Sequence, residues 1–160
     1  PWRELGTRLK WGKSLLLLYG GGLVAAGFTI SIVGMTTVFV NTDLTYIGMT
    51  RAEICGVSDR LLPVIAHDRA GFGGGLVSIG LMVITIVLHA PITRSFRQVM
   101  LFSGGSGFLA AIGVHLAVGY LNLWHLAPAF AGGVIFFSGC FLVCCGPTQQ
   151  VTRETQRAGA

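Results

Sequence analysis

Three of the four histidines are the residues of this 160-residue sequence best suited to chemistry, because each lies near one end of a long apolar stretch. Neutral imidazole binds haem iron, chlorophyll magnesium, copper or zinc, and it also transfers protons. We expect His67, His115 and His125 at the same membrane face, with His115 as the foremost candidate ligand. His89 lies at the opposite end of its stretch, roughly 30 Å away, and is not expected to join them.

Aromatic side chains accompany these histidines. Tyr120 and Trp124, with Asn122, lie next to His125 in the sequence and predict a polar ring or a quinone headgroup site. They also fit a simpler interpretation, because Tyr and Trp form aromatic belts at membrane surfaces. The bound group would be haem, a chlorophyll-type pigment or a quinone, or there is no cofactor; the sequence identifies no metal. The predicted cofactor-binding residues are His115, His67, His125, Tyr120 and Trp124.

Familiar catalytic motifs are absent from the sequence. Cys140, Cys144 and Cys145 have Cys-x-x-x-Cys-Cys spacing, whereas four-helix thiol oxidoreductases use Cys-x-x-Cys with further cysteines on the same side. There is no phosphate-binding loop and no His-Glu-x-x-His motif. We therefore predict no catalytic residues and expect a role other than an enzyme.

Four apolar stretches must position the candidate residues. They cover residues 14–40, 70–92, 99–121 and 127–145, and a helix needs about 20 mainly apolar residues to cross a bilayer. Charged residues make up 11% of the chain, against about 25% in soluble domains. The sequence therefore predicts an all-α integral membrane bundle of four transmembrane helices. Residues 1–160 would form one domain, with a loop over 41–69 and a tail over 146–160.

Positive charge is divided unequally between the two sides of this predicted bundle. Eight of the eleven Lys and Arg residues lie before the first stretch, between the second and third, or after the fourth. The positive-inside rule therefore places both termini and the Arg94–Arg97 loop in the cytoplasm, and loop 41–69 on the outer face of a bacterial inner membrane. The cations flank apolar stretches instead of forming a continuous patch, which excludes nucleic acid as a partner and leaves membrane lipids.

Glycine is abundant, with 24 residues, and most of them lie within the apolar stretches. Small residues four positions apart share a helix face and allow two helices to approach closely. Such a face would pack the four helices together, dock another subunit, or hold the flat ring of a pigment or haem. The predicted packing residues are four pairs: Gly27 with Ser31, Gly71 with Gly75, Gly107 with Ala111, and Ala129 with Gly133.

Loop 41–69 is predicted to be ordered. Thr50 and Glu53 have capping-box spacing, so a short helix is expected to begin after Thr50. Ser58 or Asp59 would cap a second helix with Pro63 in its first turn, running directly into the second apolar stretch. The expected ion-pair partners are Asp43, Glu53 or Asp59 for Arg69, and Arg51 or Arg60 for Asp68.

Two blocks of the sequence resemble a set of bacterial four-span membrane proteins of uncharacterised function. The first block comprises Phe39–Leu44, Ile47–Thr50 and His67–Gly74, and the second is His115–Pro128. The resemblance covers most of the chain. It implies the four-span topology and implies no activity.

Three functions are consistent with these observations. The leading hypothesis is a non-catalytic accessory or scaffold subunit of a larger bacterial energy-transducing complex, engaged in respiratory electron transport or photosynthesis. The glycine-rich faces favour it, since they suit contact with other membrane subunits. The second hypothesis is a membrane anchor that binds haem, pigment or quinone through the outer-side histidines. The third, a small transporter or channel, is disfavoured because the four stretches lack Asp, Glu, Lys and Arg beyond their first residues.

Overall fold

The computed structural model describes residues 6–144, which form six α-helices and include no β-strand. Four of these helices are long and apolar enough to cross a membrane: α1, α4, α5 and α6. The prediction of an all-helical chain with four long apolar helices is therefore confirmed. The predicted tail 146–160 lies outside the described residues. The helices are α1 (Thr7–Met35), α2 (Asn41–Ile47), α3 (Arg51–Val57), α4 (Leu61–His89), α5 (Arg94–Val118) and α6 (Leu123–Cys144).

The long helices begin before the apolar stretches that the sequence marks and end short of them. α1 begins at Thr7 instead of residue 14, and α4 begins at Leu61 instead of residue 70. α1 ends at Met35 instead of residue 40, α4 at His89 instead of 92, and α5 at Val118 instead of 121. A helix satisfies its own backbone hydrogen bonds, so it need not end where the apolar residues end. Loop 41–69 therefore consists of α2, α3 and the first turns of α4.

Local capping signals fix the short helices. The Thr50 hydroxyl accepts a hydrogen bond from the Glu53 amide, and the Glu53 carboxylate accepts one from the Thr50 amide at 2.7 Å. This is the predicted capping box, and α3 begins directly after Thr50 as expected. The N-cap of α4 is Arg60, whose side chain makes no capping hydrogen bond, so the prediction that Ser58 or Asp59 caps this helix is wrong. Ser58 Oγ accepts the Arg60 amide in the turn before the helix. α4 runs through Pro63 without a break into the second apolar stretch, as predicted.

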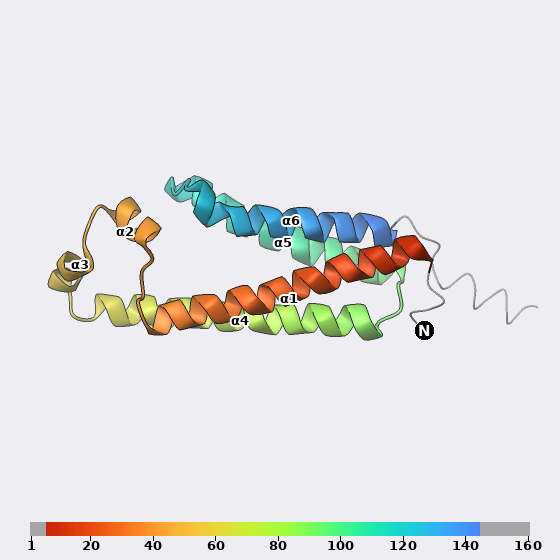
Figure 1. Cartoon of the computed structure of the whole chain (residues 1–160), viewed down its shortest axis with the longest axis horizontal. Coiled ribbons are helices and arrows are strands. Elements are labelled where there is room, and N and C mark those ends of the chain that lie inside the picture. The colour runs from red at the N-terminus through yellow and green to blue at the C-terminus, as the bar shows by residue number, and fades with distance from the viewer. Residues whose placement is uncertain (1–5, 145–160) are drawn as a thin grey trace, which may run out of the picture.

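The long helices form two antiparallel pairs, α1 with α4 and α5 with α6 (Figure 1). α1 lies along α4 near α2 and crosses to α6 at its own N-terminal end. The two pairs draw apart toward the end of the molecule that holds α2 and α3. At the opposite end an apolar cluster from all four long helices holds the pairs together. Its buried members are Leu16, Val83, Val87, Ile92, Phe96, Met100, Phe136, Cys140 and Val143.

Glycines determine how closely α1 approaches α4. Gly20 and Gly27, seven residues apart on α1, face Gly80 and Gly73 of α4. A Cβ atom on Gly27 would lie 2.5 Å from the Gly73 carbonyl oxygen, and one on Gly80 would lie 2.7 Å from the Gly20 carbonyl oxygen. Such separations exclude any side chain. The two backbones therefore pack in direct contact, as small residues permit in membrane helices.

Two of the four predicted packing pairs lie between helices. Gly27 and Ser31 are in the α1–α4 contact, where Ser31 Oγ donates to the Ala70 carbonyl oxygen at 3.4 Å. Ala129 and Gly133 face α5, and a Cβ on Gly133 would lie 3.6 Å from the Phe108 ring.

The other two predicted pairs lie away from the contacts within the described chain. A Cβ on Gly71, Gly75 or Gly107 would meet no atom of residues 6–144 within 4 Å, and Ala111 is exposed. On α4 the line of residues toward α1 contains Gly73 and Gly80. Gly75 is two positions from Gly73, and a two-residue step turns a helix by about 200°. Gly75 therefore lies on the opposite side of α4.

We expect Gly27→Leu to destabilise the protein by about 1–3 kcal/mol or more, because the added side chain must force apart two backbones in contact. The free energy of unfolding in detergent, measured by denaturant titration, checks this. Gly22→Leu is the matched control, since a Cβ at Gly22 meets nothing within 4 Å in residues 6–144. Equal stability of the two variants would contradict the described packing.

Candidate functional site

An ion pair joins α2 to α4 at the end where the helix pairs draw apart. Arg69 Nη2 donates to Asp43 Oδ2 at 2.7 Å. Asp43 is 5% exposed, which is unusual for a carboxylate and requires hydrogen-bond partners. The Arg69 guanidinium also lies 5.5 Å from the centroid of the Phe39 ring. Of the three acids expected for Arg69, the structure selects Asp43.

Local structure places the Asp43 carboxylate. Asp43 is in the first turn of α2, where its Oδ2 atom accepts the backbone N–H of Val40 at 3.0 Å. The chain enters α2 through Val38, which adopts a left-handed backbone with φ 63°. That conformation is strained for a β-branched residue, at a cost of about 1–3 kcal/mol. Burial of Val38 beside Phe39 and Ile54 stabilises the turn.

Tyr120, in the turn between α5 and α6, connects Asp43 to two histidines. Its hydroxyl donates to Asp43 Oδ1 at 3.0 Å and lies 3.4 Å from His125 Nδ1. Ring centroids are 4.6 Å apart for Tyr120 and His125, 5.4 Å for His115 and His125, and 5.8 Å for His115 and Tyr120. Tyr46 of α2 stacks on Tyr120 at 4.6 Å. We call these four residues the ring cluster.

The ring cluster also ties α2 to α5. The Tyr46 hydroxyl donates to the Val118 carbonyl oxygen at the last turn of α5. Gly119 ends that helix in a left-handed conformation with φ 73°, and the chain then turns to present Tyr120. Asn122 Oδ1 accepts the His125 amide at 3.1 Å and so begins α6.

The structure brings together three of the five predicted cofactor-binding residues: His115, Tyr120 and His125. His67 stands apart with a side chain that is 87% exposed, and its Nδ1 lies 3.2 Å from Asp68. Asp68 thus neighbours a histidine instead of Arg51 or Arg60. Trp124 is 86% exposed and belongs to the surface of α6.

Sequence reasoning placed Asp43 and Arg69 only among several alternative pairings and missed Tyr46. The contacts that define their role span 26 residues for Asp43 to Arg69 and 77 residues for Asp43 to Tyr120. The available signal was an acid three residues after Val40, because a carboxylate at this position of a helix commonly accepts a backbone amide.

Electrostatics favour a charged carboxylate and a neutral phenol in the site. Burial alone would raise the pKa of Asp43, but the Val40 amide, the Arg69 guanidinium and the Tyr120 hydroxyl outweigh it and hold that pKa below its usual value. Burial raises the pKa of Tyr120, and the negative charge of Asp43 adds to the effect, although a hydrogen bond with Thr42 opposes it. Tyr120 is therefore a hydrogen-bond donor to Asp43.

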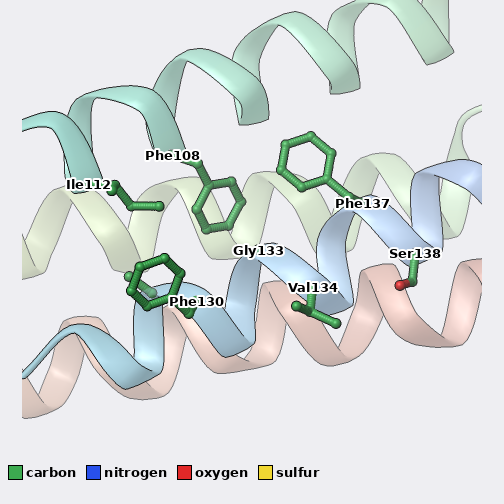
Figure 2. A pocket seen from close by; sticks show the side chains of 8 residues that line it. Phe108, Ile112, Phe130, Gly133, Val134, Phe137 and Ser138 are labelled. Atoms are coloured by element: carbon green, nitrogen blue, oxygen red, sulfur yellow. The ribbon is translucent and has the colours of Figure 1, made fainter. Parts of the chain in front are cut away.

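A groove of about 410 Å³ lies between α5 and α6 (Figure 2). Phe108 and Ile112 of α5 face Phe130, Gly133 and Phe137 of α6 across it. Ser138 is the one polar residue in its lining. Within residues 6–144 no three His, Cys, Asp or Glu side chains converge on a possible metal position. The chemistry that the site offers is therefore hydrogen bonding and stacking by imidazole and phenol rings beside an apolar groove.

Comparisons with protein-family models, with curated proteins and with solved structures find no match to this chain. The resemblance to bacterial four-span proteins stays a prediction, and function is argued from the geometry.

We expect Asp43→Asn to destabilise the fold, because it leaves the Arg69 cation without its counter-ion. Arg69 is 27% exposed, so the loss should be about 2 kcal/mol, below the roughly 3–5 kcal/mol of a fully buried pair. Asp68→Asn is the matched control at an exposed carboxylate of the same end and should change stability little. Equal effects in detergent unfolding would show that the ion pair contributes nothing.

The same pair predicts an acid-sensitive fold. The folded-state pKa of Asp43 is lowered, so its stabilisation is fully present above the unfolded value of about 3.9 and is lost as pH falls through the folded-state pKa. The difference in melting temperature between the unmodified protein and Asp43→Asn should therefore shrink below about pH 4. A difference that stays constant from pH 6 to below pH 3 would contradict the assignment.

Proposed function

We propose that this chain is a non-catalytic accessory subunit of a larger membrane assembly and that it docks onto another subunit through α4. The observation that carries the proposal is a face of α4 made of small residues that no other described element covers. Gly71, Gly74 and Gly75 have open space where a Cβ would stand, within residues 6–144, and Ser78 continues the same face.

Glycine at these positions is costly unless something packs on it. A helical glycine is destabilising by about 0.5–1 kcal/mol relative to alanine. At Gly73 and Gly80 of the same helix, close contact with α1 offsets that cost. The opposite face of α4 has the same composition without such a contact. Because lipid gives helices no hydrophobic reason to associate, a flat glycine surface is the usual means by which one membrane helix packs on another.

The helix α5 supports the same proposal. In the most apolar 18-residue segment of α5, 6% of the residues are buried within the described chain, against 28% in the corresponding segment of α6. It packs on α6 and leaves large apolar side chains uncovered, including Phe102 and Leu109 at 77% and 76% exposure. Lipid or a neighbouring subunit would cover this surface in the membrane.

The distribution of charge supports an orientation in a bacterial inner membrane. Arg8, Lys10, Arg94 and Arg97 lie at the end of the molecule where α1 and α5 begin (Figure 1). Three arginines, Arg51, Arg60 and Arg69, lie at the end that holds α2 and α3, beside the acids Asp43, Glu53, Asp59 and Asp68. By the positive-inside rule the first end faces the cytoplasm, with both termini, and α2 and α3 lie on the outer face.

The type of assembly that we propose is energy-transducing, either respiratory or photosynthetic. The ring cluster supports this choice, because imidazole and phenol groups where the apolar helices α5 and α6 meet are suited to haem, chlorophyll-type pigments and quinones. In the described chain the apolar stretches 14–40, 70–92, 99–121 and 127–144 carry no Asp or Glu for ion coupling, which supports an accessory role over transport.

Co-purification tests the proposal. A tagged chain, extracted from its native membrane in mild detergent, should elute with other membrane subunits in size-exclusion chromatography and mass spectrometry. Gly71→Leu combined with Gly75→Leu should abolish that association, because two bulky side chains then separate α4 from its partner. The chain itself should remain folded, since both positions are open within it.

Gly22→Leu on α1 is the control and should retain the partners, because it adds the same side chain at an open glycine away from α4. A lone monomer from native membranes would refute the proposal. If the Gly71→Leu and Gly75→Leu double variant still associates with the same subunits, the partner does not bind through this face of α4.

A further inference from the structure

We propose that the groove between α5 and α6 binds a lipid-soluble quinol whose ring hydroxyl groups donate hydrogen bonds to His115 and His125. Both histidines lie on the helices that form the groove. His115 is one turn from Ile112 on α5, and His125 is one turn from Ala129 on α6. Residues three or four positions apart share a helix face. The two histidines therefore continue the two walls of the groove at the end next to Tyr120.

The hydrogen bonds of His115 determine which of its nitrogens is available. His115 Nδ1 lies 2.6 Å from the Ala111 carbonyl oxygen. A carbonyl oxygen only accepts, so Nδ1 carries the proton. In the neutral imidazole the other nitrogen, Nε2, then has a free lone pair and acts as an acceptor.

Tyr120 determines which nitrogen of His125 carries the proton. The Asp43 carboxylate only accepts, so the Tyr120 hydroxyl donates its proton to Oδ1. The Tyr120 oxygen is then the acceptor in its 3.4 Å contact with His125 Nδ1, which must supply the proton. His125 Nε2 is therefore also an acceptor. The Asp43–Arg69 pair thus sets the state of a histidine that it does not touch.

Two imidazole acceptors at the head of an apolar groove define the chemistry of the ligand. A quinol offers two hydroxyl donors on a flat ring, whereas the oxidised quinone offers carbonyl oxygens that can only accept. The quinol ring would lie at the edges of the two imidazoles, because the lone pair of each Nε2 lies in the plane of its ring. The contacts among His115, Tyr120 and His125, with centroids 4.6–5.8 Å apart, hold those edges in place. An isoprenoid tail would lie along Phe108, Gly133 and Phe137. The groove, of about 410 Å³, is open to the surface of the bundle, so the tail would lie against α5 and α6 on one side and against lipid on the other.

The test is a binding titration with one probe in two redox states. A short-chain benzoquinol, kept reduced under anaerobic conditions, and its oxidised quinone are titrated into the purified protein by calorimetry, with empty micelles as the blank. We expect saturable binding of the quinol and at least about tenfold weaker binding of the quinone, since the quinone cannot donate to either Nε2.

Variants then locate the site. His115→Phe combined with His125→Phe should weaken quinol binding about tenfold or more, while circular dichroism confirms an unchanged helix content. Gly133→Leu should also weaken binding, because the new side chain fills the groove opposite Phe108. His67→Phe is the matched control and should bind quinol normally, because His67 is exposed and outside the ring cluster.

Three results would overturn the inference: no saturable quinol binding, a preference for the quinone, or full binding by the double histidine variant. The inference does not depend on docking through α4. The double histidine variant should keep its co-purifying partners even where it loses quinol, so failure of one proposal is distinguishable from failure of the other.

Discussion

A carboxylate in apolar surroundings is stable only when hydrogen-bond donors surround it, and Asp43 receives three. They come from the Val40 amide, the Arg69 guanidinium and the Tyr120 hydroxyl. These donors belong to the start of α2, to α4, and to the turn between α5 and α6. One side chain therefore joins three parts of the chain at the end where the two helix pairs draw apart, and the position of the ring cluster depends on it.

The close contact of α1 and α4 makes that arrangement possible. A Cβ on Gly34 would lie 2.8 Å from the Cβ of Arg69, so the last glycine of the α1 row packs directly against the residue that pairs with Asp43. The glycines at Gly20 and Gly27 hold the same register further along the helices. Backbone packing thus determines where the Arg69 guanidinium lies. A larger residue at position 34 would displace α4 and, with it, the charge of Arg69.

Different kinds of interaction hold the helices together at the two ends of the molecule. Apolar side chains from all four long helices meet at the end where α1 begins, and their contacts are dense but chemically uniform. Polar and aromatic contacts join the helix pairs at the end near α2. Such contacts are directional, so they specify one arrangement of the two helix pairs. They also couple the protonation of Asp43 and Tyr120 to the hydrogen bonding of His125.

Features that depend only on neighbouring residues could be predicted from the sequence. Four apolar stretches predicted four long helices, Thr50 and Glu53 predicted the start of α3, and Pro63 was compatible with the first turn of α4. Three other features arise from contacts between distant parts of the chain. Arg69 pairs with Asp43, and α4 faces α1 with Gly73 and Gly80. His115 and His125 meet Tyr120, whereas His67 does not. Each of these depends on how far a helix is rotated and shifted against another. That choice is made by backbone contact and by hydrogen bonds across up to 77 residues, which local patterns do not encode.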